Sequence, residues 1–150
     1  MPPADGEGEA AGKDAAWLDL ERVNGFSGEH IGVMKWGPSG NEMVFASGAV
    51  VVAMDAAGEK QRFFLGHDDD ISCLTLDGSR THAASGQVGA EPVVLVWSVS
   101  SLAQLARLRH GRVLGITAVG FSADGGLLAS ASADNTVKVW EVASGRCIAT

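Results

Sequence analysis

The sequence lacks the features that mark several common classes of protein. No apolar run approaches the roughly 20 residues that are needed to cross a bilayer, and residues 1–12 lack the basic and apolar regions of a secretory signal peptide. We therefore expect a soluble, intracellular protein. Proline is also scarce, with 4 residues against 20 glycines. Glycine scattered in this way indicates many turns and short strands.

Positive charge and cysteine are scarce as well. The chain has 11 lysines and arginines against 18 acids, a formal net charge of −7, whereas nucleic-acid-binding domains carry an excess of positive charge. We expect neither a nucleic acid nor a membrane as partner. The two cysteines, Cys73 and Cys147, each lie in an apolar run, where a free cysteine packs as a small hydrophobe; a disulfide or a metal ligand is the alternative. We expect no metal site and no cofactor.

Composition divides the chain into two parts. Residues 1–16 are mainly Gly, Ala, Glu and Asp, and they cannot bury enough surface to offset the entropy lost on ordering, so we expect a disordered tail. Residues 17–150 consist of short runs rich in β-branched and aromatic residues, separated by Gly, Asp, Ser and Pro. Such runs predict strands and an all-β fold. Trp17 is expected to anchor the first unit, and Trp36 to lie in a core strand.

A strand–turn–strand pattern recurs three times in this second part. Turn signals at Ser39-Gly40, Asp77-Gly78 and Asp124-Gly125 each lie between two apolar runs. Trp97 and Trp140 follow the second and third hairpins, 43 positions apart. This period matches the ~40–45 residues of a WD repeat.

The third unit closely resembles the WD-repeat consensus in Phe121–Gly125, Leu128–Ser132 and Asp134–Glu141, with Glu141 in place of the usual Asp. The second unit keeps Gly66-His67 and Val96-Trp97, whereas the first keeps the hairpin and lacks the Trp. The resemblance implies an all-β WD-repeat propeller. Its approximate repeats are residues 23–64, 65–108 and 109–150. Because a propeller ring typically has 4–8 blades, three repeats make a partial, unclosed propeller, and we expect the natural protein to continue.

The resemblance also implies a buried polar network in each blade. The network links a Trp on the third strand, a Ser on the second strand, a His before the first strand and an Asp in the tight turn. This assigns His67, Ser85 and Trp97 in the second repeat, and Ser130, Asp134 and Trp140 in the third. The His of the third repeat stays open, because its usual position holds Arg112 and His110 is offset by two; the second repeat lacks the Asp. A Ser inside a core strand is not an exposed nucleophile, so we expect no enzyme and no catalytic residue.

The first two units are similar to the start of the propeller in the echinoderm microtubule-associated-protein-like family and its ciliary and centriolar relatives. The similarity lies in Gly25–Gly28, in the Trp-less first unit, in Gln61–His67 and in Ser85–Val88. It implies a non-enzymatic structural or scaffold protein of the cytoskeleton, in a cilium, flagellar axoneme or centriole. Tubulin or other microtubule-associated proteins would be its partners. Arg62–His67 is more like the centriolar relatives, and the short tail is more like the flagella-associated ones.

One alternative function stays open. In this alternative the chain is a generic WD-repeat adaptor, such as a substrate receptor or a signalling scaffold. Two candidate contact surfaces are the basic cluster and the enlarged loop Gly86–Pro92. The residues assigned to them are Arg107, Arg109, His110, Arg112, Gln87 and Glu91. The alternative for the basic cluster is a solvated loop whose charges pair with Asp68–Asp70. The alternative for the enlarged loop is an insertion that the fold tolerates and that binds nothing.

Overall fold

The computed structural model describes residues 19–26, 28–112 and 114–150, which form strands, turns and loops. Their strands make three four-stranded antiparallel sheets, and each sheet uses four consecutive strands in sequence order. The all-β prediction, with three units that do not close, is confirmed. The disordered tail predicted for residues 1–16 and the anchor predicted at Trp17 lie outside the described residues. In the part of the chain that is described, no helix has the length and apolar character needed to cross a bilayer.

Most of the strands have five or six residues. The first sheet contains β1 Met34–Trp36, β2 Glu42–Ser47, β3 Val50–Asp55 and β4 Gln61–Phe64. The second contains β5 Ile71–Leu76, β6 His82–Gln87, β7 Val93–Ser98 and β8 Gln104–Arg109. The third contains β9 Ile116–Phe121, β10 Leu127–Ser132, β11 Val137–Glu141 and β12 Arg146–Ala149. The shorter strands are β1 with 3 residues, and β4 and β12 with 4 residues each.

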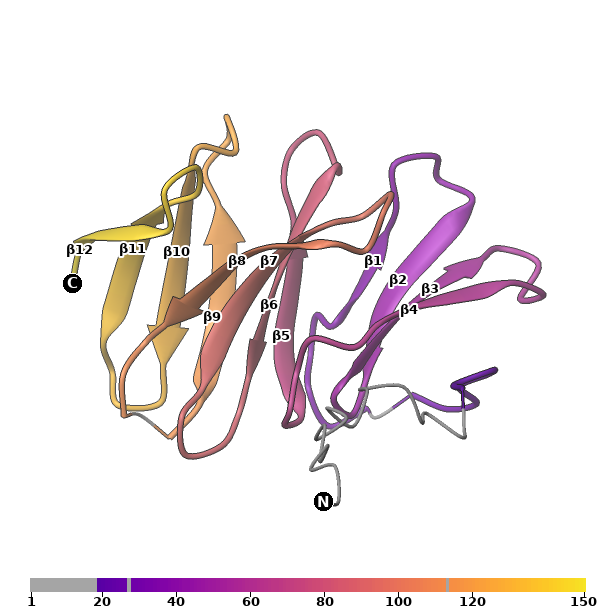
Figure 1. The fold of residues 1–150 in the computed structure, drawn as a ribbon, viewed down its shortest axis with the longest axis horizontal. Helices are drawn as coiled ribbons and strands as arrows, with labels where there is room; N and C mark the ends of the chain where they lie inside the picture. Colours follow the sequence, from indigo (N-terminus) through magenta and orange to yellow (C-terminus); the bar gives the residue numbers. More distant parts are fainter. Residues whose placement is uncertain (1–18, 27, 113) are drawn as a thin grey trace, which may run out of the picture.

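The three sheets stand side by side in an open arc, with the second sheet between the other two (Figure 1). Neighbouring sheets meet along the first strand of the following sheet: β5 contacts β1 and β2, and β9 contacts β5 and β6. The first and third sheets therefore lie at opposite ends of the arc. Each of them has one face packed on the second sheet and one face without a neighbouring sheet (Figure 1).

Two apolar clusters fill the spaces between the sheets. One joins the first and second sheets around Val44, Val51, Leu95 and Trp97. The other joins the second and third sheets around Val94, Val96, Ile116, Leu128 and Trp140. Both faces of the second sheet are thus buried, which is why β7 reads as a continuous apolar run instead of an alternating one.

Turn chemistry fixes the hairpins. In the β9–β10 turn, Gly125 has a φ of 73°, a left-handed conformation that glycine adopts without a steric penalty. The carboxylate of Asp124 accepts hydrogen bonds from the Ser122 hydroxyl (2.6 Å) and the Gly126 amide (3.0 Å). The Asp-Gly signal therefore marks a real turn, in which the aspartate pairs with the local polar groups.

The N-terminal segment lies against the first sheet. The side-chain amide of Gln61 accepts a hydrogen bond from the Val23 amide (2.8 Å) and donates one to the Val23 carbonyl (3.0 Å). The Phe26 ring packs edge-on against Phe45, with centroids 6.2 Å apart. The core position expected for Trp36 is wrong, because this side chain is 52% exposed. Trp36 points to the face of the first sheet that no other sheet covers.

Candidate functional site

The second sheet contains a continuous buried polar network. The indole N–H of Trp97 donates to the Ser85 hydroxyl (3.1 Å), and the same hydroxyl lies 2.6 Å from Nε2 of His67. Nδ1 of His67 lies 2.7 Å from Oε1 of Gln87, and Nε2 of Gln87 donates to Asp68 (2.5 Å). The structure thus brings together the three residues assigned to this network and adds two that sequence reasoning did not assign.

The acidic end of this network sets the direction of every hydrogen bond in it. The ionised carboxylate of Asp68 only accepts, so the amide nitrogen of Gln87 faces Asp68 and the amide oxygen faces His67. His67 therefore carries its proton on Nδ1, and its Nε2 accepts the proton of the Ser85 hydroxyl. The Ser85 oxygen is then free to accept from Trp97. A network in which every member is paired removes the cost of burying these groups.

Gln87 takes the place of the aspartate that the second repeat lacks. It lies two residues after Ser85 on β6, so both side chains point to the same face of the sheet. Its contact role was assigned on the assumption that the enlarged loop is exposed. That assignment is corrected here, because Gln87 is buried between His67 and Asp68.

Burial lowers the pKa of His67, an effect that Arg107 adds to, whereas the hydrogen bond to Gln87 and the charge of Asp68 oppose it. The unfolded chain, with a histidine pKa of about 6.5, then binds more protons than the folded chain just below this pH. The stability that neutral His67 contributes is complete above about pH 6.5. It is lost as the pH falls toward the pKa that His67 has in the folded chain.

We expect the urea midpoint of the protein to fall between pH 7.5 and pH 5.5, and to fall less in His67→Gln, because the variant lacks this titration. Urea unfolding followed by circular dichroism at both pH values measures how far the midpoint of each protein falls. Asp68 stays ionised throughout this range, since the hydrogen bond from Gln87 lowers its pKa. An equal fall of the urea midpoint in the wild-type protein and in His67→Gln would contradict the assignment of His67 as a neutral member of the network.

The third sheet contains a shorter version of the network. The indole N–H of Trp140 donates to the Ser130 hydroxyl (2.8 Å), and Nε2 of His110 lies 3.2 Å from the Ser130 carbonyl oxygen. His110 is 2% exposed and packs near the Trp140 ring. The contact role assigned to His110 is therefore wrong, because the loop before β9 turns this ring into the core while Arg112 stays at the surface.

Asp134 pairs within its own turn. It accepts hydrogen bonds from the Ser132 hydroxyl, the Thr136 hydroxyl (2.6 Å) and the Thr136 amide (3.0 Å). The Ser132 bond is the largest cause that lowers the pKa of Asp134 to about 2. Among the described contacts, none joins Asp134 by a hydrogen bond to His110, Ser130 or Trp140. Its assignment to one continuous network with Ser130 and Trp140 is corrected to a separate turn anchor.

The first sheet replaces the polar network with apolar side chains. Strand register places Phe45 at the position of Ser85, and Met54 at the position of Trp97. Phe45 is buried beneath Phe26. The first unit therefore lacks both the hydroxyl and the indole, which explains physically why its sequence pattern is degenerate.

The serine hydroxyls of the two networks are buried within the sheets. Ser85 is 0% exposed and its oxygen already bonds to His67 and Trp97. Ser130 is also buried, between Trp140 and His110. A nucleophilic hydroxyl must reach the bond that it attacks, and neither of these two hydroxyls is open to solvent.

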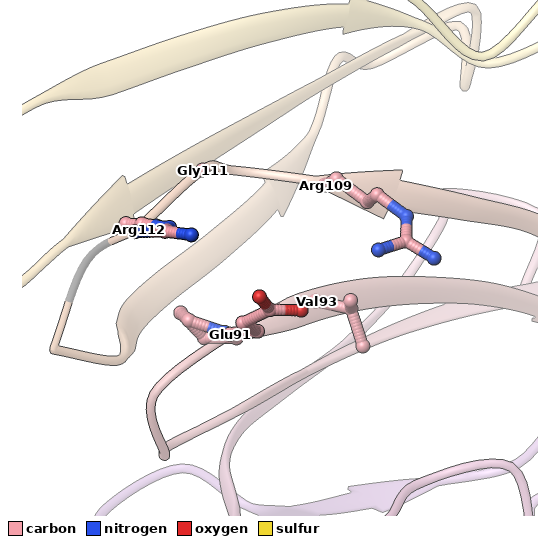
Figure 2. Close-up of a pocket in the computed structure, with 6 residues that line it drawn as sticks. Glu91, Val93, Arg109, Gly111 and Arg112 are labelled. Atoms are coloured by element: carbon pink, nitrogen blue, oxygen red, sulfur yellow. The ribbon is translucent and has the colours of Figure 1, made fainter.

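A cationic cleft lies at the rim of the second and third sheets. Its volume is about 150 Å³, and it is lined by Glu91, Pro92, Val93, Arg109, Gly111 and Arg112. Figure 2 shows the Glu91 carboxylate between the Arg109 and Arg112 side chains, with Val93 along the wall. Among the described residues, the ion pair made by an arginine is Arg62–Glu42. Neither arginine of the cleft is therefore held in an ion pair with another described residue.

Arg107 lies outside this cleft. It is exposed on β8, and its charge acts on His67 and Asp68 on the side of the second sheet that faces the first. Of the residues assigned to partner contact, the structure thus brings together Arg109, Arg112 and Glu91. It separates Arg107 from them.

Comparison with known families decides what these sheets are. The family described as WD domain, G-beta repeat matches residues 58–98 and 103–141, which is more than half of the chain. The chain belongs to the WD-repeat family. The two matched ranges contain the Trp97 and Trp140 networks. They leave out β1 to β3 of the first sheet, where Phe45 and Met54 stand in place of the Ser and the Trp.

Several relatives of this WD-repeat chain carry ciliary or centriolar names. Cilia- and flagella-associated protein 52 of Chlamydomonas reinhardtii is 34% identical over 87% of this chain and 22% of its own length. WD repeat-containing protein 90 of Homo sapiens is 34% identical over 85% of this chain and 7% of its own length. Centriole proteome protein 16 of Chlamydomonas reinhardtii is 32% identical over 84% of this chain and 7% of its own length.

These comparisons confirm the predicted similarity to ciliary and centriolar WD-repeat proteins. The chain spans less than a quarter of the length of each of the three relatives. The flagella-associated and centriolar relatives match it at nearly equal identity, so the choice that the sequence motifs left open stays open.

Proposed function

We propose that this WD-repeat chain is a non-enzymatic scaffold element of the microtubule structures of a cilium, flagellum or centriole. The observation that carries this proposal is the similarity to ciliary and centriolar proteins over more than four fifths of the chain. The burial of the Ser85 and Ser130 hydroxyls in packing networks supports a structural role for the sheets. A rigid stack of sheets with loops at its rim suits a platform that holds other proteins.

The cationic cleft is the proposed contact to an acidic partner, such as tubulin. Arg109 and Arg112 approach the cleft from the end of β8 and from the loop that follows it, and Pro92 and Val93 give it an apolar wall. Two guanidinium groups that form no ion pair with the described residues are suited to bind carboxylates, each through a fork of N–H donors. Glu91 lies between them, so an acidic partner has to displace or adjoin this carboxylate.

Co-sedimentation with microtubules at two salt concentrations tests the contact. We expect Arg109→Ala with Arg112→Ala to weaken binding by about two- to thirtyfold at low salt, since each of the two exposed charge pairs contributes ~0.2–1 kcal/mol. The effect should shrink at high salt, because exposed charges are screened over ~8 Å at physiological ionic strength. The double variant should also bind with a flatter dependence on salt.

A matched control separates this contact from a general effect of net charge. Arg80→Gly with Arg146→Ala removes the same two charges from exposed positions away from the cleft, and Arg80 has a φ of 58° that glycine tolerates. Equal binding of the two double variants would show that the cleft is solvated surface. If the wild-type protein neither co-sediments with microtubules nor localises to cilia or centrioles, the generic adaptor interpretation replaces this proposal.

A further inference from the structure

One wall of the cationic cleft comes from a loop that is longer in the second sheet than in the first. Two residues, Gly48 and Ala49, join β2 to β3, whereas residues 88–92 join β6 to β7. The longer loop supplies Glu91 and Pro92, which line the cleft. The lining residues belong to β7, β8 and the loops beside them. The cleft is therefore formed by the second sheet and by the loop that leads into the third.

Neighbouring segments hold this longer loop on both sides. The Val88 amide donates a hydrogen bond to the Asp70 carbonyl (2.9 Å), and Val88 forms a β-bridge with Gly115 in the loop before β9. The Asp69 carboxylate packs against Gly89. The wall of the cleft is thus in place before a partner arrives, which reduces the ordering cost that binding has to overcome.

The charge of the cleft matches one carboxylate. Arg109 and Arg112 bring two positive charges and Glu91, which lies between them, brings one negative charge, so the lining residues carry a net charge of +1 (Figure 2). A single glutamate side chain balances this charge. A phosphoserine carries about −1.5 to −2 at pH 7, and its additional charge would face the Glu91 carboxylate. Like charges placed together in this way select against a ligand.

The size of the cleft also suits one side chain. Its volume is about 150 Å³, and a cavity of roughly this volume holds one benzene molecule, which is close in size to the side chain of glutamate. Pro92 and Val93 are buried and give the cleft an apolar wall. The methylene groups of a glutamate can lie along this wall while its carboxylate reaches the two arginines.

Resting on the proposed contact with an acidic partner, we propose that the cleft takes one glutamate side chain of that partner, and that Glu91 excludes phosphate groups from it. Arg109 and Arg112 donate hydrogen bonds to the carboxylate oxygens of the bound glutamate. Glu91 determines specificity, because it keeps the charge of the cleft at the value that one carboxylate neutralises. Phosphorylation of the partner at the bound position would therefore release it.

Titration of the protein with two small probes tests this selectivity. N-Acetyl-glutamate amide and N-acetyl-phosphoserine amide present the two anionic groups on the same backbone. Nuclear magnetic resonance follows the side-chain N–H signals of Arg109 and Arg112 at low salt, where exposed charges are screened least. We expect the wild-type protein to bind the glutamate probe about threefold more tightly than the phosphoserine probe.

Two matched variants assign the selectivity to Glu91. Glu91→Gln keeps the shape of the side chain and removes its charge, so the phosphoserine probe should gain about tenfold in affinity and become the tighter ligand. Glu59→Gln makes the same change at an exposed position between β3 and β4, and should leave both affinities unchanged. Glu91 is exposed as well, so neither variant should unfold the chain; circular dichroism checks this.

The outcomes separate this inference from the proposed function. Wild-type protein that prefers the phosphoserine probe, or Glu91→Gln that binds both probes as Glu59→Gln does, would overturn the inference and leave the scaffold role standing. Arginine signals that respond to neither probe would overturn it too. Wild-type protein that binds the glutamate probe and fails to co-sediment with microtubules would instead overturn the proposed contact with microtubules, and the selectivity of the cleft would stand.

Discussion

Replacing Trp97 with alanine should lower the free energy of unfolding by about 3–5 kcal/mol, the usual cost of removing a buried aromatic side chain. Trp97 is fully buried and stacks on Phe64 with ring centroids 5.0 Å apart. Its loss opens a cavity between the first and second sheets. It also removes the N–H that donates to Ser85, which leaves a buried oxygen with one partner fewer. Urea unfolding followed by circular dichroism measures the change.

Two further variants separate packing from hydrogen bonding. Trp97→Phe keeps an aromatic ring next to Phe64 and loses the N–H, so we expect a smaller cost than for alanine. Trp36→Ala removes the same side chain from the exposed face of the first sheet, and its effect should stay within about 0.5–1 kcal/mol. If Trp97→Ala and Trp36→Ala destabilise the chain equally, Trp97 is not a principal contributor to the core.

The fold was predictable from the sequence because the period and the strand pattern report the same geometry. Trp97 and Trp140 recur at one repeat length, and Asp-Gly turns mark the hairpins between apolar runs. Ser85 and Trp97 come into contact because they occupy fixed positions on neighbouring strands of one sheet. Local patterns of this kind survive in a single sequence, since strand register converts spacing directly into proximity.

Other features depend on loop paths and on replacements that spacing does not report. Gln87 reaches His67 because a longer side chain occupies the network face of β6, yet it appears in the sequence as part of an enlarged loop. Its position two residues after Ser85 was the available signal. His110 is buried, and Arg112 is exposed, because of the path of the loop before β9. Phe45 and Met54 complete a core without the polar pattern that identifies the other repeats.

Gly86 lies where the second and third sheets pack closely together, and Gly86→Ala should lower the free energy of unfolding by about 1–3 kcal/mol. A Cβ at this position would lie 2.6 Å from Cγ2 of Ile116 and 2.8 Å from Sγ of Cys73. Both atoms are buried in the same apolar cluster, so the two sheets would have to move apart. Gly120→Ala is the control, because a Cβ there meets no atom within 4 Å.

A double-mutant cycle identifies the atom responsible. Ile116→Ala removes Cγ2 and should itself cost about 2–5 kcal/mol through the cavity that it leaves. In the double variant, the new methyl group at position 86 partly fills this cavity, so the combined cost should be smaller than the sum of the single costs. A coupling of about 0.5–3 kcal/mol is usual for residues in contact. Additive costs in urea unfolding would mean that Gly86 is restricted by its own sheet, and not by the approach of the third sheet through Ile116.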